Sequence, residues 1–195
     1  MDSDHTLYRR EDGANLIEIR LNSVQQLFDS LDPAPFPERG LDNAAEEYIV
    51  GSVRDLPLSE PLKLVFYLPA SQIGRTDATG LCDAIHNYFD YRLVMATRDL
   101  RHQRRDGRIT LAIGLAFLFA CISLRQVVFF AFGPGTLQQI AAEGLLISGW
   151  VAMWRPIQLF LYEWWPLKRS CAVFAKLKAT PVELRPLAEA PAALV

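Results

Sequence analysis

The sequence predicts an α+β fold, in which a small strand-helix-helix-strand-helix domain is followed by a hairpin of two transmembrane helices. The hairpin is predicted by two apolar runs, Ile109–Phe132 and Leu137–Tyr162, which flank a short break around Pro134. Each run exceeds the roughly 20 residues that a helix needs to cross a bilayer. The domain is predicted by two strand-like segments, residues 14–21 and 62–68, with helical periodicity between and after them.

Charge divides the chain in the same way as hydropathy. Residues 1–100 contain 17 acidic and 9 basic side chains, whereas residues 101–195 contain 5 and 11. An acidic domain is a poor match for phosphate backbones, so nucleic acid is not expected as a partner. We expect an acidic cytosolic domain over residues 1–106 and the hairpin over residues 107–166. A basic juxtamembrane segment with a disordered Pro/Ala-rich tail is expected over residues 167–195.

The domain begins with an alternating segment. In "ANLIEIRL", residues 14–21, isoleucines point to one side and charged residues to the other, which is the pattern of a half-buried strand. Residues 23–31 predict a short helix. Three prolines over residues 33–37 predict an extended turn, because proline fixes φ and restricts the residue before it.

Two longer helices and a second strand follow. A helix is predicted from about Asp42 to Asp55, because Asp42 can cap its first turn. Residues 62–68 predict an apolar strand, and residues 78–106 predict a third helix. Only Gly107 separates this helix from the first apolar run, so the two are expected to form one long rod. Two strands alone make a marginal sheet, so its edges invite pairing with another chain unless helices cover the sheet.

Basic residues predict the orientation of the hairpin. Five arginines precede the first apolar run, and three lysines and one arginine follow the second within a short distance, whereas the connecting loop has no charge. Positive residues flank the cytoplasmic ends of membrane helices, so both termini are expected in the cytoplasm. Tyr162, Trp164 and Trp165 are expected at the membrane surface. The acidic N-terminus lacks the apolar segment of a signal peptide.

Four polar side chains fall within the apolar runs: Arg125, Gln126, Glu143 and Arg155. A charge at the bilayer centre costs about 2.5–3.5 kcal/mol on insertion scales, so each needs a partner or a route to water. Arg125 and Glu143 lie nine residues before and after Pro134, at equal depth in a hairpin. One alternative is therefore an ion pair between them. Arg155 is close enough to the cytoplasmic end to reach water.

The other alternative packs the helices through small residues. Small side chains recur at spacing four on each run and would let the backbones approach; they are Ala112, Ala116 and Ala120 on the first run and Gly144, Ser148 and Ala152 on the second. If these stripes face each other, Arg125 and Glu143 lie on opposite flanks and would seek partners on another subunit. The sequence leaves both alternatives open. Pro156 is expected to kink the second helix.

The third helix carries a weak candidate for chemistry. Cys82, His86 and Asp90 recur at spacing four, so they share one face and could be metal ligands or a nucleophile–base arrangement. The competing interpretation is a mixed polar face beside the core. The three cysteines are scattered, and no phosphate-binding, hydrolase or zinc-protease motif is present. We therefore expect no catalytic residues, no metal and no cofactor.

Two stretches carry a resemblance to a known group of proteins. "LDPAPFPERGLDNAAEEYIVGSVRDLP", residues 31–57, and "YEWWPLKR", residues 162–169, resemble uncharacterised bacterial membrane proteins with a small N-terminal cytosolic domain and a C-terminal two-helix membrane hairpin. The resemblance implies a place in the bacterial inner membrane. It implies no catalytic motif.

The expected function is that of a bacterial inner-membrane accessory or scaffold protein. Its partners would be the lipid bilayer and either a cytosolic protein or a second copy of the chain, docked at the strand edges and at residues 32–42. One alternative is a subunit of an oligomeric transport or channel-like assembly, in which the intramembrane polar residues line a pore. A further alternative is a membrane-anchored enzyme that uses the polar face of the third helix.

Overall fold

The computed structural model describes residues 8–30, 32–33, 35, 39–74, 77–131 and 135–189. They divide into two compact units. The first unit contains both ends of the chain, Met1–Met95 and Ser170–Val195, and the second contains Ala96–Arg169. The first segment of this unit ends at Met95, whereas the predicted boundary is at residue 106. The unit also includes Ser170–Val195, which follows the hairpin and was not predicted to belong to the domain.

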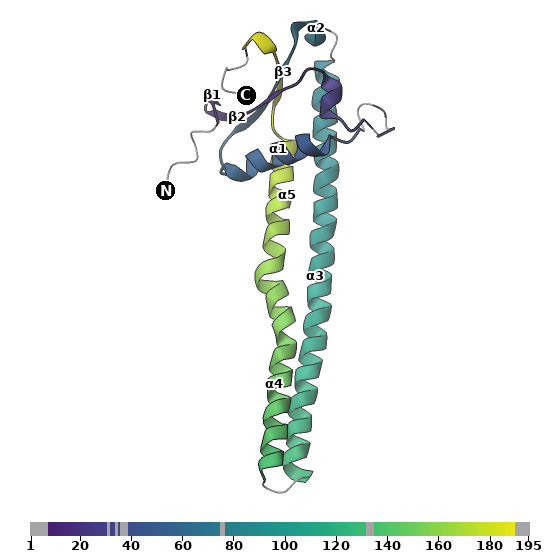
Figure 1. Ribbon diagram of the computed structural model, residues 1–195, viewed down its shortest axis with the longest axis vertical. Helices are drawn as coiled ribbons and strands as arrows, with labels where there is room; N and C mark the ends of the chain where they lie inside the picture. Colours follow the sequence, from purple (N-terminus) through teal and green to yellow (C-terminus); the bar gives the residue numbers. More distant parts are fainter. Residues whose placement is uncertain are drawn as a thin grey trace. The chain divides into compact units, whose positions relative to one another are not determined.

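The first unit is built on a four-stranded sheet. Its order is β1 (Arg10–Glu11), β2 (Ala14–Arg20), β3 (Leu62–Leu68) and β4 (Val182–Pro186). The β1–β2 pair is antiparallel, whereas β2–β3 and β3–β4 are parallel. The strand from the end of the chain, yellow in Figure 1, therefore completes a sheet whose other strands come from the first third of the sequence.

The turn between β1 and β2 has a clear local cause. Asp12 and Gly13 both have positive φ, 51° and 78°. Two such residues in succession make the tight turn that matches the twist of a hairpin, and Asp-Gly is a favoured pair for it. This turn adds a strand that the alternating pattern of residues 14–21 did not predict.

The helical elements join these strands. They are η1 (Val24–Leu27), α1 (Asn43–Asp55), α2 (Ala70–Ile73), α3 (Ala78–Ala131), α4 (Thr136–Gln158), the π-helical turn η3 (Leu159–Glu163), α5 (Trp164–Lys178) and η4 (Leu187–Glu189). The short helix predicted over residues 23–31 is confirmed only as the 3-10 turn η1. The capping role of Asp42 is confirmed, because its Oδ1 accepts a hydrogen bond of 2.9 Å from the Ala44 backbone N–H. The predicted continuous helix through Gly107 is also confirmed.

Buried apolar side chains from both ends of the chain form the core of the first unit. They include Ile17, Ile49, Leu64, Phe66, Leu81, Ile85, Phe89, Val173 and Leu177. The ring centroids of Phe89 on α3 and Phe174 on α5 are 6.4 Å apart. On α5, Lys176 also donates to the backbone carbonyls of Leu58 and Glu60. The end of α5 is therefore a core helix, although the sequence predicted a juxtamembrane segment there.

The predicted disorder of the C-terminal tail is wrong for Val182–Glu189. Proline and alanine dominate the composition of this region, but valine and leucine alternate with Glu183 and Arg185 within it. This alternation suits a strand, and pairing with β3 supplies the backbone partners that the segment lacks by itself. Residues 190–195 lie outside the described part of the chain.

An ion-pair network links the first strand to the last. Arg185 on β4 donates to both carboxylate oxygens of Glu11 on β1, at 2.6 and 2.9 Å, and also to Glu183. Its side chain is only 13 % exposed. The hydrogen bond from Arg185 lowers the pKa of Glu11 to about 2. The Tyr67 hydroxyl donates to Glu18 at 2.6 Å, and burial together with this hydrogen bond raises the pKa of Tyr67.

We expect the Glu11→Gln variant to lose part of the acid dependence of stability. The folded-state pKa of Glu11 is below the ordinary value of 4.5, so its contribution is complete above about pH 4.5 and is lost as pH falls towards 2. The midpoint of thermal unfolding of the detergent-solubilised protein, followed by near-UV circular dichroism from pH 7 to pH 2, measures this dependence. Glu47→Gln, an exposed substitution on α1, is the control. Identical pH profiles for wild type and Glu11→Gln would contradict this role.

The second unit is a helical hairpin. The later part of α3 runs beside α4, η3 and the start of α5 in the opposite direction (Figure 1). The helical stretches Ala78–Ala131 and Thr136–Lys178 are long and apolar enough to cross a membrane, judged by length and composition. Large apolar side chains lie on its exterior, and Phe130 and Leu137 are 88 % and 84 % exposed. This surface has the reverse of the pattern of a water-soluble hairpin.

The two helices contact each other along a seam of small residues. The buried positions recur every seven residues, and half-buried Leu118 and Ala152 divide these intervals into spacings of three and four; the buried positions include Gly107, Gly114, Cys121, Ala142, Gly149 and Pro156. An added Cβ at Gly149 would lie 2.8 Å from Leu118 Cδ1, and one at Gly114 would lie 3.1 Å from Pro156 Cγ. Close approach therefore depends on glycine at both positions.

Of the small residues predicted to form this contact, Ala152 lies at it, since its carbonyl oxygen would be 3.4 Å from a Cβ at Gly114, and the others do not. Ala112, Ala116, Ala120, Gly144 and Ser148 are exposed, Ala152 is half-buried, and a Cβ at Gly144 would meet nothing within 4 Å. The predicted stripes kept a strict spacing of four, whereas two helices that stay in contact along their length bury positions that alternate between spacings of three and four. The kind of residue was right and its face was wrong.

Candidate functional site

The polar face of α3 is occupied by the end of the chain. Cys82 Sγ donates to the Val182 carbonyl at 3.6 Å, and His86 Nε2 lies 2.9 Å from the Thr180 carbonyl. Asp90 forms an ion pair with Lys178 at 2.7 Å. The structure thus brings the three residues together on one face, as their spacing predicted, but each has a separate partner.

The three partners lie at spacing two along the chain and run antiparallel to α3. Lys178 is the last residue of α5, the Thr180 carbonyl belongs to the turn that follows, and Val182 begins β4. Burial raises the pKa of the Cys82 thiol, and the nearby Asp83 raises it further, which disfavours the nucleophilic thiolate. Within the described residues, no group of three or more His, Cys, Asp or Glu side chains is placed to hold a metal ion.

Arg125 and Glu143 line one pocket of about 470 Å³ near the hairpin turn. Within the described part of the chain, no ion pair joins them. The Arg125 guanidinium lies 5.4 Å from the centroid of the Phe129 ring, and its buried Nε has no hydrogen-bond partner. Glu143 is exposed and accepts a hydrogen bond of 3.1 Å from Gln139. Gln126 is exposed and does not line this pocket.

We expect the Glu143→Leu variant to keep the hairpin fold. The carboxylate has no cationic partner among the described residues, and in a bilayer an exposed charge is unfavourable by about 2.5–3.5 kcal/mol at the centre. Helicity by circular dichroism and the midpoint of unfolding in dodecyl sulfate should therefore equal or exceed those of the wild type. Glu143→Gln removes the charge but keeps a side-chain oxygen that can accept the hydrogen bond from Gln139. It therefore separates the effect of the charge from that of the hydrogen bond. A clear loss of stability in both variants would show that this carboxylate has a stabilising partner.

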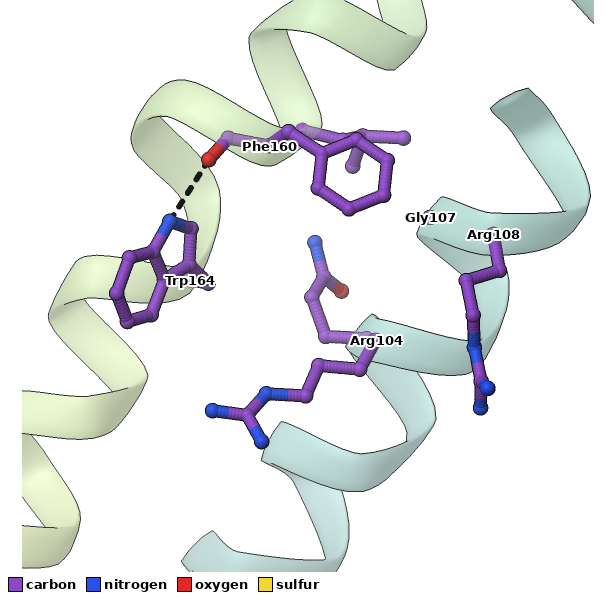
Figure 2. Close-up of a pocket in the computed structure, with 7 residues that line it drawn as sticks. Arg104, Gly107, Arg108, Phe160 and Trp164 are labelled. Carbon is purple, nitrogen blue, oxygen red and sulfur yellow. Dashed lines mark hydrogen bonds between the residues drawn. The ribbon is translucent and has the colours of Figure 1, made fainter.

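A second pocket lies at the other end of the hairpin. Its volume is about 500 Å³, and it is lined by Gln103, Arg104, Gly107, Arg108, Leu159, Phe160 and Trp164. The Phe160 ring projects towards Gly107, and the Arg104 side chain extends towards the helix that carries Trp164 (Figure 2). An added Cβ at Gly107 would lie 3.8 Å from the Phe160 ring, so the absence of a larger side chain there keeps the pocket open.

The π-helical turn shapes one wall of this pocket. Pro156 has no N–H to donate within α4, and the Leu159 N–H bonds to the carbonyls of Arg155 and Pro156. The wide turn that follows, Leu159–Glu163, presents Leu159 and Phe160 to the pocket, and the Trp164 indole N–H donates to the Phe160 carbonyl at 2.7 Å. α4 continues through Pro156 to Gln158 and the irregular turn begins at Leu159, so the predicted kink at Pro156 stays a prediction. Such π-turns are frequent at functional sites.

Charge in the second pocket is positive and unpaired. The Glu163 carboxylate accepts hydrogen bonds of 2.9 Å from Arg155 and from the pocket-lining Gln103. The Arg155 side chain is exposed, and its charge is paired with Glu163. Within the described residues, neither Arg104 nor Arg108 forms an ion pair. The arrangement can hold an anion that carries an apolar group.

Sequence reasoning interpreted these arginines only as an orientation signal and missed the pocket. A signal was present, because Arg104, Gly107 and Arg108 occupy i, i+3 and i+4 and so share one helix face. The aromatic residues opposite them could not be paired with this face without the register of the hairpin.

The whole chain was compared with known proteins. No family model, no curated protein and no solved structure matches it. The resemblance to bacterial proteins with a two-helix membrane hairpin therefore stays a prediction.

Proposed function

We propose that this protein is a membrane-anchored accessory or scaffold protein of the bacterial inner membrane. In this proposal the hairpin of the second unit crosses the bilayer, and the first unit is held at the cytoplasmic surface as a docking domain. The observation that supports it best is the apolar exterior of the hairpin, where side chains such as Phe119, Phe130 and Leu137 are largely exposed. In water this surface would be unfavourable, and in lipid it is matched.

The sheet topology supports an even number of crossings. β3 precedes the hairpin and β4 follows it, yet the two strands are neighbours in one sheet. A chain that leaves this domain, crosses a membrane and returns to the domain must cross twice, once with each helix. The basic residues at both ends of the hairpin favour the cytoplasm as the side on which the domain lies.

The strand edge available for docking belongs to β4, which was not among the two strands predicted from the sequence. Both edges of β3 are paired, by β2 and by β4. Among the described strands, β1 and β4 each pair on one side only, and β4 is the longer of the two, so its outer edge can accept a strand from a protein partner. Asp32 and Asp42 have local roles, because Asp32 accepts from the Gly40 N–H and Asp42 caps α1. Part of the segment between them lies outside the described residues.

The alternatives differ in how well the structure supports them. Each member of the polar face of α3 contacts the C-terminal segment, which leaves the enzyme hypothesis without a free trio of side chains. The transport hypothesis depends on Arg125 and Glu143, which share a pocket in the hairpin. A pore would need several copies around it, because two helices cannot enclose one.

Membrane fractionation tests the anchoring proposal. After ultracentrifugation of lysed cells, we expect the protein in the membrane pellet, resistant to alkaline carbonate and extracted only by detergent. Recovery in the supernatant, or release by carbonate, would overturn it. Purification in mild detergent followed by native mass spectrometry then tests docking. A stoichiometric partner or a second copy would support docking, and a bare single chain would contradict it.

A further inference from the structure

We infer that the pocket lined by Arg104, Arg108, Phe160 and Trp164 is a binding site for the headgroup of an anionic phospholipid. The two arginines would hold the phosphate, and Leu159 and Phe160 would contact the glycerol and the start of an acyl chain. This inference rests on the proposed function, because the pocket meets a lipid headgroup only when the hairpin lies in a bilayer.

The cationic side of the pocket is formed by two exposed arginines, Arg104 and Arg108, whose side chains extend in different directions in Figure 2. Arg104 and Arg108 are one helical turn apart, so their Cβ atoms are separated by about 5–6 Å. A guanidinium presents a planar set of donors that matches phosphate oxygens, and two of them can hold one group from two directions. Among the described residues, neither side chain has an ion-pair partner, so both are available.

The nearby negative charge is already engaged. Glu163 accepts from Arg155 at one carboxylate oxygen and from Gln103 at the other. Its repulsion of a bound phosphate is reduced by this pairing with Arg155, while the two pocket arginines keep their charge. The pocket therefore discriminates in favour of an anion rather than a zwitterion.

The apolar side of the pocket gives it a direction that matches a lipid. Phe160 faces Gly107, and the next residues on α3 begin the apolar run at Ile109 (Figure 2). Trp164 lies one turn further from that run, and Tyr162, Trp164 and Trp165 form the aromatic cluster expected at headgroup depth. Arg108 and Phe160 thus lie where the apolar run begins, and Arg104 and Trp164 lie one turn further from it, so the pocket combines cationic and apolar groups at the level where a phospholipid headgroup meets its chains. A free phosphate would use only the two arginines.

General attraction of a basic segment to an acidic membrane predicts something different. That attraction depends on the number of arginines near the surface and hardly on their positions. Arg101 and Arg105 lie on the same helix and are exposed, but they do not line the pocket. If lipid binds in the pocket, replacing Arg104 and Arg108 should reduce lipid retention more than replacing Arg101 and Arg105 does.

The experiment reconstitutes the full chain in nanodiscs of equal parts phosphatidylglycerol and phosphatidylcholine and counts retained lipids by native mass spectrometry. We expect wild type and the Arg101→Ala/Arg105→Ala variant to retain one phosphatidylglycerol in preference to phosphatidylcholine. The Arg104→Ala/Arg108→Ala variant should show at least a tenfold lower retained fraction. Gly107→Leu, which fills the pocket without changing charge, should show a similar loss. Excess inorganic phosphate should not displace the lipid.

Four outcomes would overturn the site. They are equal loss in the two arginine pairs, no loss in Gly107→Leu, no preference for phosphatidylglycerol, or full displacement by inorganic phosphate, which would assign a free anion instead. Flotation of each variant with the same lipids separates this inference from the proposed function. If all variants float but show no lipid preference, only the site fails. If the wild type does not float, anchoring fails as well.

Discussion

A chain that ends after Ala179 is expected to have an unfolded first unit. The truncation removes β4, and with it the whole parallel ladder from Leu64–Val182 to Leu68–Pro186. It also removes the carbonyls that meet Cys82 and His86 on α3. Domains are stable by only about 5–15 kcal/mol, so the loss of one of three main strands is expected to exceed the available margin. The segment that looked like a tail is thus a structural part of the domain.

Limited proteolysis in detergent measures this effect. Sites within residues 39–74 should become cleavable in the truncated chain, while the hairpin keeps its helical circular dichroism. A chain that ends after Glu189 retains every described residue and is the matched control, expected to resist cleavage as the wild type does. Equal protection of residues 39–74 in the two truncated chains would show that β4 is dispensable for the sheet.

Gly149→Leu is expected to separate the two helices of the hairpin. A Cβ at this position would lie 2.8 Å from Leu118 Cδ1, 3.3 Å from Cys121 Cβ and 3.6 Å from the Leu118 Cα. The first of these atoms can move, but the backbone atom cannot move without displacing the helix. Overpacking of this kind costs about 1–3 kcal/mol, and more when backbones must separate. In lipid no hydrophobic gain between helices offsets it.

Gly144→Leu provides the control for this variant on the same helix. It makes the same chemical change and gains the same helix propensity, but its Cβ would meet nothing within 4 Å. Unfolding in dodecyl sulfate, followed by tryptophan fluorescence, should show a clear loss for Gly149→Leu and a change within about 0.5 kcal/mol for Gly144→Leu. Equal losses of stability in the two variants, or a larger loss for Gly144→Leu, would instead support helix packing through the predicted stripe that contains Gly144.

The elements that the sequence could predict are those whose signal is local. The strands β2 and β3 and the helix α1 follow from alternation, apolar runs and the Asp42 cap. The Asp12-Gly13 pair was a local signal for β1 and could have been used. β4 has a period-two pattern, but it is short and lies among prolines. Its pairing with β3 depends on a return of the chain through the hairpin, which periodicity does not report.

The candidate sites show the same limit. Spacing correctly placed Cys82, His86 and Asp90 on one face of α3, but their function depends on the segment packed against them, which was assigned to disorder. The equal depth predicted for Arg125 and Glu143 agrees with their place in one pocket, but among the described residues the two side chains do not form the ion pair that was one of the alternatives. Rotation about each helix axis decides such contacts, and a small error in rotation moves a side chain from one flank to the other.

We propose that the chain leaves its domain, crosses a membrane twice and returns to complete the sheet. Single reporter cysteines test it in a chain whose native cysteines are replaced. Ser59→Cys precedes the hairpin, Gly135→Cys lies at its turn, and Ala188→Cys follows β4; all three positions are exposed. With an impermeant maleimide in intact bacterial cells, whose outer membrane is made permeable to the reagent, we expect labelling at 135 alone, and labelling at 59 and 188 only after the inner membrane is opened. Labelling of 59 and 188 from opposite sides, or protection of 135 together with them, would contradict the account.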